Sequence, residues 1–154
     1  MILFFIFGTL IGSFLNVIII RLPKNLSIVT PRSHCPNCKN EIPFYLNIPI
    51  ISYIFLKGKC QKCKSKISLQ YISIEIITGL IFYLLFSSLP FEIEKAIILS
   101  LVFSCLIIIA MIDFYHFLIP SFVILILLLS LILSYFESLM IENTIHPINI
   151  NQNI

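Results

Sequence analysis

Four cysteines form two closely spaced pairs in a polar part of the chain. Cys35 and Cys38 make the first pair, and Cys60 and Cys63 make the second, which gives the pattern C-x2-C-x21-C-x2-C. Four thiolates with this spacing match a tetrahedral zinc site, although the 21 intervening residues slightly exceed the usual window and require the loop to fold back. Because a four-thiolate site has no open coordination position, we expect the metal to hold the loop rather than to catalyse a reaction.

Disulfide bonds and a redox-active Cys-x-x-Cys are the alternative readings of these cysteines. Disulfides are rare in the reducing cytoplasm, where we place this loop below. The symmetry of the two pairs and the flanking residues Lys59, Lys62 and Lys64 favour a structural metal over a redox role. Cys105 lies within an apolar run, and we expect it to be an ordinary buried side chain.

Two carboxylates lie next to apolar runs. A carboxylate at the edge of a membrane span is a functional candidate, so Asp113 is one, with equal weight given to a solvated residue at a helix end. His116 would share its helical face if the helix continues, and Pro120 could open a cavity nearby. For Glu75, a contact with the N-terminal dipole of its helix is the favoured reading.

The elements that position these residues are predicted to be membrane-spanning helices. Apolar residues make up 59% and charged residues 11% of the 154 residues, against about a quarter charged in a soluble domain. Runs of roughly 20 apolar residues cross a bilayer. We therefore predict an all-α membrane protein with about four transmembrane helices and a zinc-bound cytoplasmic loop between the first and second. The predicted parts are a first transmembrane helix (1–20), a four-cysteine loop (21–71), three transmembrane helices (72–89, 96–112 and 121–136) and a polar, frayed tail (137–154).

The first apolar run is expected to be a retained span rather than a signal peptide. No basic region precedes it, and no small-x-small cleavage site follows it. Gly8 and Gly12 form a G-x-x-x-G, a spacing that lets helices approach closely in lipid. Ser13 and Asn16 in the same run are polar, and one reading of them is a helix–helix hydrogen bond.

The basic residues are concentrated in the loop. Nine of the ten Lys and Arg residues lie between Arg21 and Lys66. A nucleic-acid patch is one reading, but the apolar flanks favour a cytoplasmic loop under the positive-inside rule, able to touch anionic lipid headgroups. We therefore expect no nucleic-acid partner, a multi-pass protein of the inner (cytoplasmic) membrane, and both the cysteine loop and Asp113 on the cytoplasmic side.

Four stretches together resemble the prepilin peptidase family. They are "GSFLNVIIIRLP" at 12–23, "RSHCPNC" at 32–38, "NIPIISYIFLKGKCQKCKSKIS" at 47–68 and "MIDFYHFLIP" at 111–120. The resemblance implies a polytopic membrane aspartic endopeptidase that cuts the leader from type IV prepilins and related secretion proteins. It identifies Asp113 with the first catalytic aspartate. It also implies, for many members, S-adenosylmethionine-dependent methylation of the new amino terminus, an activity associated with the part that carries the cysteine loop.

The chain departs from the family pattern at three places. Ser121 stands where the family usually has an aspartate, and Ile72 where it usually has a proline. The Gly-x-Gly-Asp motif that carries the second catalytic aspartate is absent, since the four glycines lie at positions 8, 12, 58 and 79. Aspartic proteolysis needs two carboxylates that share a proton.

Several explanations are open for the missing aspartate. We favour a truncated product. Alternatively, a second polypeptide could supply the aspartate, or two copies of the chain could each donate Asp113. A fourth explanation, given less weight, is that Glu75 replaces the missing aspartate. The competing functional class is a catalytically inactive, zinc-stapled membrane module that binds a prepilin or a partner subunit.

Overall fold

All regular elements in the described part of the chain are helices. The structure is a computed structural model that describes the backbone of residues 1–150 and the side chains of residues 1–43 and 45–139. Within these residues there is no strand, only two isolated bridges in the cysteine loop. The elements are α1 (Ile2–Arg21), the short 3-10 helices η1 (Leu22–Lys24) and η2 (Phe44–Asn47), α2 (Ile51–Phe55), α3 (Leu69–Ser88), α4 (Ile93–His116) and α5 (Ser121–Ile150).

Four of these helices are long and apolar enough to cross a membrane. The spanning stretches are Ile2–Lys24, Leu69–Ser88, Ile93–His116 and Ser121–Leu139. At about 1.5 Å per residue, each covers about 30 Å, which is the thickness of the hydrocarbon core of a bilayer. The predicted all-α fold with four spanning helices is therefore confirmed, and the four cysteines lie between the first and second of them.

The second and third spans begin earlier than the apolar runs indicate, because polar residues stabilise their first turns. The Ser68 hydroxyl accepts a hydrogen bond from the backbone N–H of Gln70 at 3.2 Å, which caps the start of α3. At the start of α4, Lys95 pairs with Glu92 at 2.9 Å. A prediction of the spans from apolar residues alone therefore misses these polar first turns.

The third and fourth spans also end later than predicted. Helix α4 continues through His116 and ends where Phe117 adopts a left-handed conformation with φ 52°. Helix α5 continues past residue 136 into the predicted tail, and the Ser138 hydroxyl donates to the Tyr135 carbonyl at 2.7 Å within it. The last four residues of the predicted tail, 151–154, lie outside the described residues.

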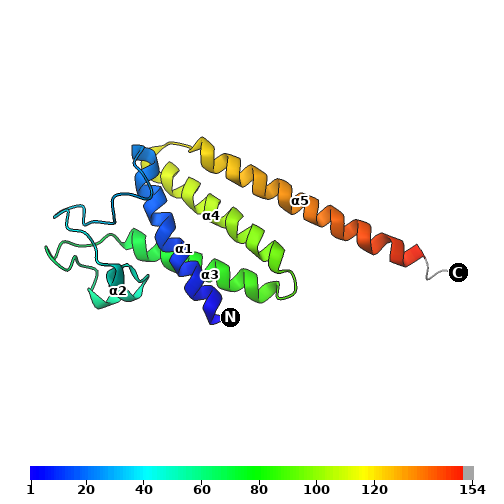
Figure 1. The fold of residues 1–154 in the computed structure, drawn as a ribbon, viewed down its shortest axis with the longest axis horizontal. Coiled ribbons are helices and arrows are strands. Elements are labelled where there is room, and N and C mark those ends of the chain that lie inside the picture. Colours follow the sequence, from blue (N-terminus) through cyan, green and yellow to red (C-terminus); the bar gives the residue numbers. More distant parts are fainter. Residues whose placement is uncertain (151–154) are drawn as a thin grey trace.

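Helices α1 and α3 cross obliquely in close contact (Figure 1), and glycines make this possible. A Cβ atom added to Gly12 would lie 2.9 Å from the Cα of Glu75. One added to Gly79 would lie 2.7 Å from the Cγ2 of Thr9, and Gly8 is equally crowded. The predicted role of the Gly8–Gly12 spacing in close helix packing is confirmed.

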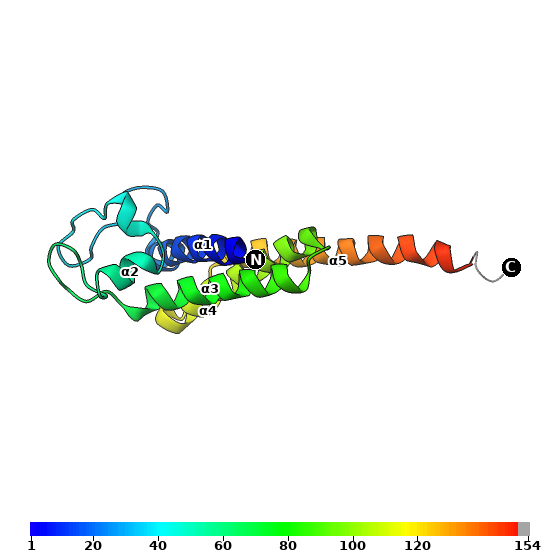
Figure 2. The same ribbon diagram turned by 90° about the horizontal axis from the view of Figure 1, so that it is seen from below.

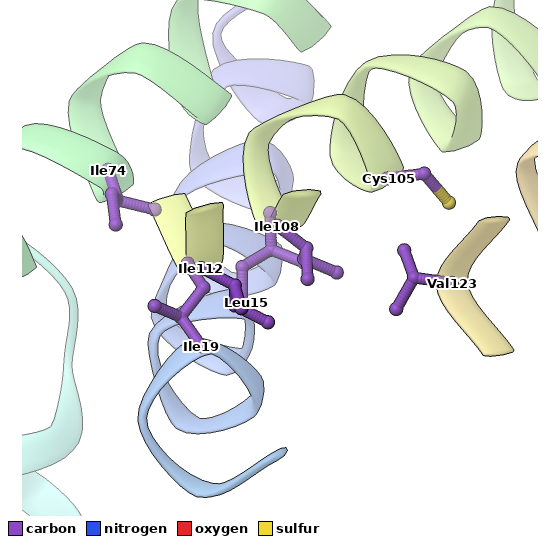
Figure 3. Packing of buried hydrophobic residues seen from close by; sticks show 7 residues of the cluster. All are labelled: Leu15, Ile19, Ile74, Cys105, Ile108, Ile112 and Val123. Carbon is purple, nitrogen blue, oxygen red and sulfur yellow. The ribbon is translucent and has the colours of Figure 1, made fainter. Parts of the chain in front are cut away.

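Helix α4 lies between α3 and α5 (Figure 1) and contributes more residues to the main buried cluster than any other helix (Figure 3). The core cluster consists of Leu15 and Ile19 from α1, Ile74 from α3, Cys105, Ile108 and Ile112 from α4, and Val123 from α5. Cys105 is 3% exposed among apolar neighbours, which confirms its predicted role as a buried apolar residue. The outward-facing apolar side chains of the same helices form the surface that lipid would cover.

Hydroxyl side chains buried between the helices bond to their own helix. Each donates to a backbone carbonyl three or four residues earlier, at 2.7–2.8 Å; they are Thr9, Thr78, Ser100, Ser104 and Ser130. These groups therefore need no water, which suits helices that lie in lipid.

Candidate metal centre and carboxylates

The first cysteine pair lies on a tight hairpin. The Cys35 N–H donates to the Asn40 carbonyl at 2.9 Å, and the Lys39 N–H donates to the Cys35 carbonyl at 2.8 Å. Lys39 adopts a left-handed conformation with φ 54°, and His34 and Glu41 pair across the base of the hairpin. The turn therefore brings the sulfurs of Cys35 and Cys38 to the same side.

The second pair repeats this hairpin with the same spacing. The Cys60 N–H donates to the Ser65 carbonyl at 2.8 Å, and the Lys64 N–H donates to the Cys60 carbonyl at 3.1 Å. Lys64 is again left-handed, with φ 58°, and Lys59 pairs with Lys66. The loop thus contains two equivalent cysteine hairpins, here called knuckles, as the symmetric sequence pattern predicts.

The two knuckles face each other, and their four sulfurs lie within 4.8 Å of one another. The Cys35 and Cys63 sulfurs are 3.8 Å apart, and those of Cys38 and Cys60 are 4.0 Å apart. All four cysteines are free. Zinc–sulfur bonds of about 2.3 Å in a tetrahedron separate the sulfurs by about 3.8 Å, so the cluster has the dimensions of a four-thiolate zinc site.

Hydrogen-bond donors around the sulfurs favour thiolates at two of these positions. The pKa of Cys35 is lowered by the backbone N–H of Cys38, and that of Cys63 is lowered to about 6 by the Ser65 hydroxyl and N–H. At Cys38 the Asn40 N–H lowers the pKa, but burial and the neighbouring thiols outweigh it and raise the pKa to about 11. Four thiolates this close repel one another, and a bound cation would remove that repulsion.

Side chains also join the two knuckles to each other. The Lys62 ammonium donates to the Asn40 side-chain oxygen at 2.8 Å, and the Asn37 amide points its nitrogen at the Cys63 sulfur at 3.8 Å. These contacts connect residues more than twenty positions apart. The long segment between the two cysteine pairs therefore folds back on itself, as the sequence requires.

Arg21 fixes the start of the loop at the end of α1. Its guanidinium donates to the Ser27 carbonyl at 2.9 Å and to the Pro31 carbonyl at 2.7 Å. The loop projects beyond one end of the helices (Figure 2). The start of α3 and the end of α4, which carries Asp113, lie at this same end (Figure 1).

Glu75 lies in the second turn of α3 and is only 8% exposed. Its Oε2 atom accepts a hydrogen bond from the Ile50 N–H at 2.8 Å. The expected dipole contact at the helix start therefore gives way to a direct bond between α3 and the loop. No feature of the sequence indicates this contact, because it joins positions 25 residues apart through irregular backbone.

Asn16 forms the helix–helix hydrogen bond that the sequence left open. Its Nδ2 atom donates to the Tyr71 carbonyl of α3 at 3.1 Å, and the residue is 2% exposed. Its Oδ1 atom has no hydrogen-bond partner among the described residues. Asn16 thus ties α1 to the start of α3 just below the loop.

Asp113 is exposed in the last turn of α4. His116 is in the same helix one turn later, so the predicted shared face exists, but no ion pair joins the two within the described residues. No described side chain forms a hydrogen bond with the Asp113 carboxylate either, and Glu75, which is bonded to Ile50, is not joined to it. Among the residues that the structure describes, no hydrogen bond or ion pair therefore joins Asp113 to a second carboxylate.

Comparison with known proteins places this arrangement in a family. The model of the family described as "Bacterial Peptidase A24 N-terminal domain" matches residues 6–89, which include most of α1, the four-cysteine loop and α3. No solved structure matches the chain.

Curated relatives carry the same assignment. The chain is 40% identical to a prepilin leader peptidase/N-methyltransferase of Myxococcus xanthus over 75% of its length, which is 34% of that protein. It is 40% identical to the protein of the same name in Bacillus subtilis over 76% of the chain and 47% of the relative. For the Vibrio cholerae protein of that name the identity is 36%, over 79% of the chain and 51% of the relative.

The chain thus spans about a third to a half of the length of these relatives. The match covers two of its membrane-length helices and the whole candidate metal centre. The chain is therefore a multi-pass membrane protein that belongs to the prepilin leader peptidase family.

Proposed function

We propose that the chain takes part in cleaving the leader peptide of type IV prepilin-like proteins, as a membrane aspartic endopeptidase with Asp113 as one of its two catalytic carboxylates. The observation that carries the proposal is the position of Asp113. It is exposed at the end of α4, at the same end of the bundle as the four-cysteine loop, in a chain of this family (Figure 1). A substrate with a basic leader and an apolar helix would reach this edge by moving sideways through the bilayer.

The chemistry requires a second carboxylate. One carboxylate takes a proton from the attacking water, while the protonated partner donates one to the scissile carbonyl oxygen. Glu75 is a poor partner because it is buried and holds the Ile50 N–H. The proposed second carboxylate therefore has three candidate sources: a part of the protein outside these 154 residues, a second polypeptide, or a second copy that contributes its own Asp113.

Zinc has a structural role in this proposal. Cys35, Cys38, Cys60 and Cys63 would hold it, and the bound ion supplies a rigid link between the two knuckles. The concentration of Lys and Arg in the loop supports a cytoplasmic position in the inner membrane. Labelling of a Lys24→Cys variant from one side of the membrane tests this position, since labelling from outside the cell would reverse the orientation.

Methylation of the new amino terminus with S-adenosylmethionine is a second proposed activity. It is supported by the curated relatives, whose names include N-methyltransferase, and by the family match, which includes the whole cysteine loop. Incubation of membranes with a cleaved pilin and labelled S-adenosylmethionine measures it directly. A pilin that gains no label in the presence of zinc-loaded protein would limit the chain to cleavage.

A non-catalytic role is the alternative to cleavage. In that case the chain is a zinc-stapled membrane module that binds a prepilin or a partner subunit. Proteoliposomes that contain the 154-residue chain alone, mixed with a prepilin, distinguish the possibilities. Cleavage by the chain alone supports a pair of Asp113 residues from two copies. Cleavage only after a second polypeptide is added supports a split enzyme, and binding without cleavage under both conditions supports the module.

A further inference from the structure

Helix α2 exposes three large apolar side chains on one face. Ile51, Ile54 and Phe55 have the i, i+3, i+4 spacing of a single helical face, and they are 64%, 65% and 79% exposed. The helix turns Ser52, which is 9% exposed, to the protein side. An exposed apolar patch of this kind marks a surface that contacts lipid or another protein.

The position of α2 is fixed by contacts with α3 and with the segment that leads into α3. The Ile50 N–H, directly before α2, bonds to Glu75 Oε2 at 2.8 Å. The Tyr53 hydroxyl donates to the Ile67 carbonyl at 3.3 Å. Gly58 packs against the Tyr53 ring, where an added Cβ would lie 2.9 Å from the hydroxyl oxygen.

These contacts set the depth of α2 relative to the membrane. Glu75 follows the first residue of α3, Leu69, by six positions, or about 9 Å along the helix axis. Since α3 is as long as the hydrocarbon core is thick, this bond places the start of α2 within the length of one glutamate side chain of the second turn of a spanning helix, near the membrane boundary. Amphipathic interfacial helices place their apolar face at about this depth, roughly 5–10 Å into the boundary between headgroups and acyl chains.

The positively charged residues that follow α2 also fit a position at the membrane interface. Lys57 and Lys59 are both exposed and come directly after the apolar face. Lysine side chains next to a buried apolar face extend to the headgroup phosphates. Leu69, the first residue of α3, is also 70% exposed, so this span presents apolar surface at the same end of the bundle.

We propose that α2 is a membrane-interfacial anchor: Ile51, Ile54 and Phe55 insert into the lipid boundary beside α3, and Lys57 and Lys59 lie among the headgroups. The anchor holds the metal-binding loop against the bilayer surface instead of leaving it to move freely in water. The bond from Ile50 to Glu75 sets its depth.

Single tryptophans test this placement, because the chain contains none. Phe55→Trp and, as a second variant, Ile54→Trp put the probe on the α2 face, where high exposure leaves room for the larger ring. Leu80→Trp marks the lipid-facing middle of α3, since Leu80 is 47% exposed, and Gln61→Trp marks the exposed position between the cysteines of the second knuckle. The full chain is reconstituted in nanodiscs of equal amounts of phosphatidylcholine and phosphatidylglycerol, and zinc content is measured for each variant.

Lipids brominated near the headgroup or near the chain ends then report depth. We expect Phe55→Trp to emit at shorter wavelength than Gln61→Trp and to lose most of its fluorescence to bromines near the headgroup. Leu80→Trp should lose most to bromines near the chain ends, and Gln61→Trp should respond only to aqueous iodide.

Two results overturn the proposal. If the probes at positions 54 and 55 respond to iodide as Gln61→Trp does, α2 lies in water. If they are protected from both iodide and bromine, a second copy or another protein covers the face instead of lipid.

Discussion

The four-cysteine loop and the end of α4 lie at the same end of the bundle, but their functional side chains are held very differently. Each cysteine belongs to a hydrogen-bonded hairpin, and the four sulfurs already have the spacing of a tetrahedral site. Asp113 is exposed, and within the described residues its carboxylate has no hydrogen-bonding partner. The difference indicates that the loop already has the geometry of a metal site, whereas the Asp113 carboxylate has no described partner with which to share a proton.

Loss of one metal ligand should have the largest effect. We expect Cys60→Ser to release the metal and unfold the loop, since structural zinc supplies about 10 kcal/mol of apparent binding free energy in small domains. Metal analysis of purified protein should give about one zinc per chain for the parent and none for the variant. Cys105→Ala is the matched control, because Cys105 is buried among the helices. A folded, protease-resistant loop in metal-free Cys60→Ser protein would contradict the structural role.

The next largest effect is expected where α1 meets α3, beneath the loop. A leucine at Gly12 would push against the α3 backbone at Glu75, which cannot move aside as a flexible side chain could. We expect Gly12→Leu to destabilise the protein by about 3 kcal/mol, at the upper end for overpacking. Unfolding in increasing proportions of denaturing detergent measures this change. Leu10→Ile serves as the control because Leu10 is 51% exposed, and equal stability of the two variants would argue against the close crossing.

The link between the loop and α3 should have a smaller effect. Glu75→Leu leaves the Ile50 N–H without its acceptor, a loss of about 2 kcal/mol for a buried donor. Glu75→Gln keeps an acceptor oxygen and should cost much less. Hydrogen exchange at Ile50 measures the difference directly. Equally fast exchange in both variants would show that the side chain of Glu75 does not hold the loop.

The smallest effect on stability is expected at Asp113. Because the side chain is exposed and has no described bonding partner, Asp113→Asn should change the free energy of unfolding by no more than about 0.5 kcal/mol. The same detergent titration checks this value. A clearly destabilised Asp113→Asn variant would mean that the carboxylate has a structural partner, and the contrast with the loop would then fail.

The sequence predicts those features that depend on period and spacing. Apolar runs predict the four spanning helices, and the two Cys-x-x-Cys pairs predict one cluster, because each knuckle is closed by hydrogen bonds within a few residues. The ends of the spans were predicted less well, since polar caps such as Ser68 carry helices beyond the apolar run. The bond from Ile50 to Glu75 and the exposed face of α2 could not be predicted, because both depend on how an irregular loop folds back onto a helix.

One measurement tests most directly the contrast between the metal loop and the carboxylate site. It is prepilin cleavage in membranes that contain the parent or the Asp113→Asn protein, at equal protein and zinc content. The account predicts that the parent assembly removes the leader, whereas the variant retains about one zinc per chain and removes none. Unchanged cleavage by Asp113→Asn would exclude this residue from the reaction and contradict the account.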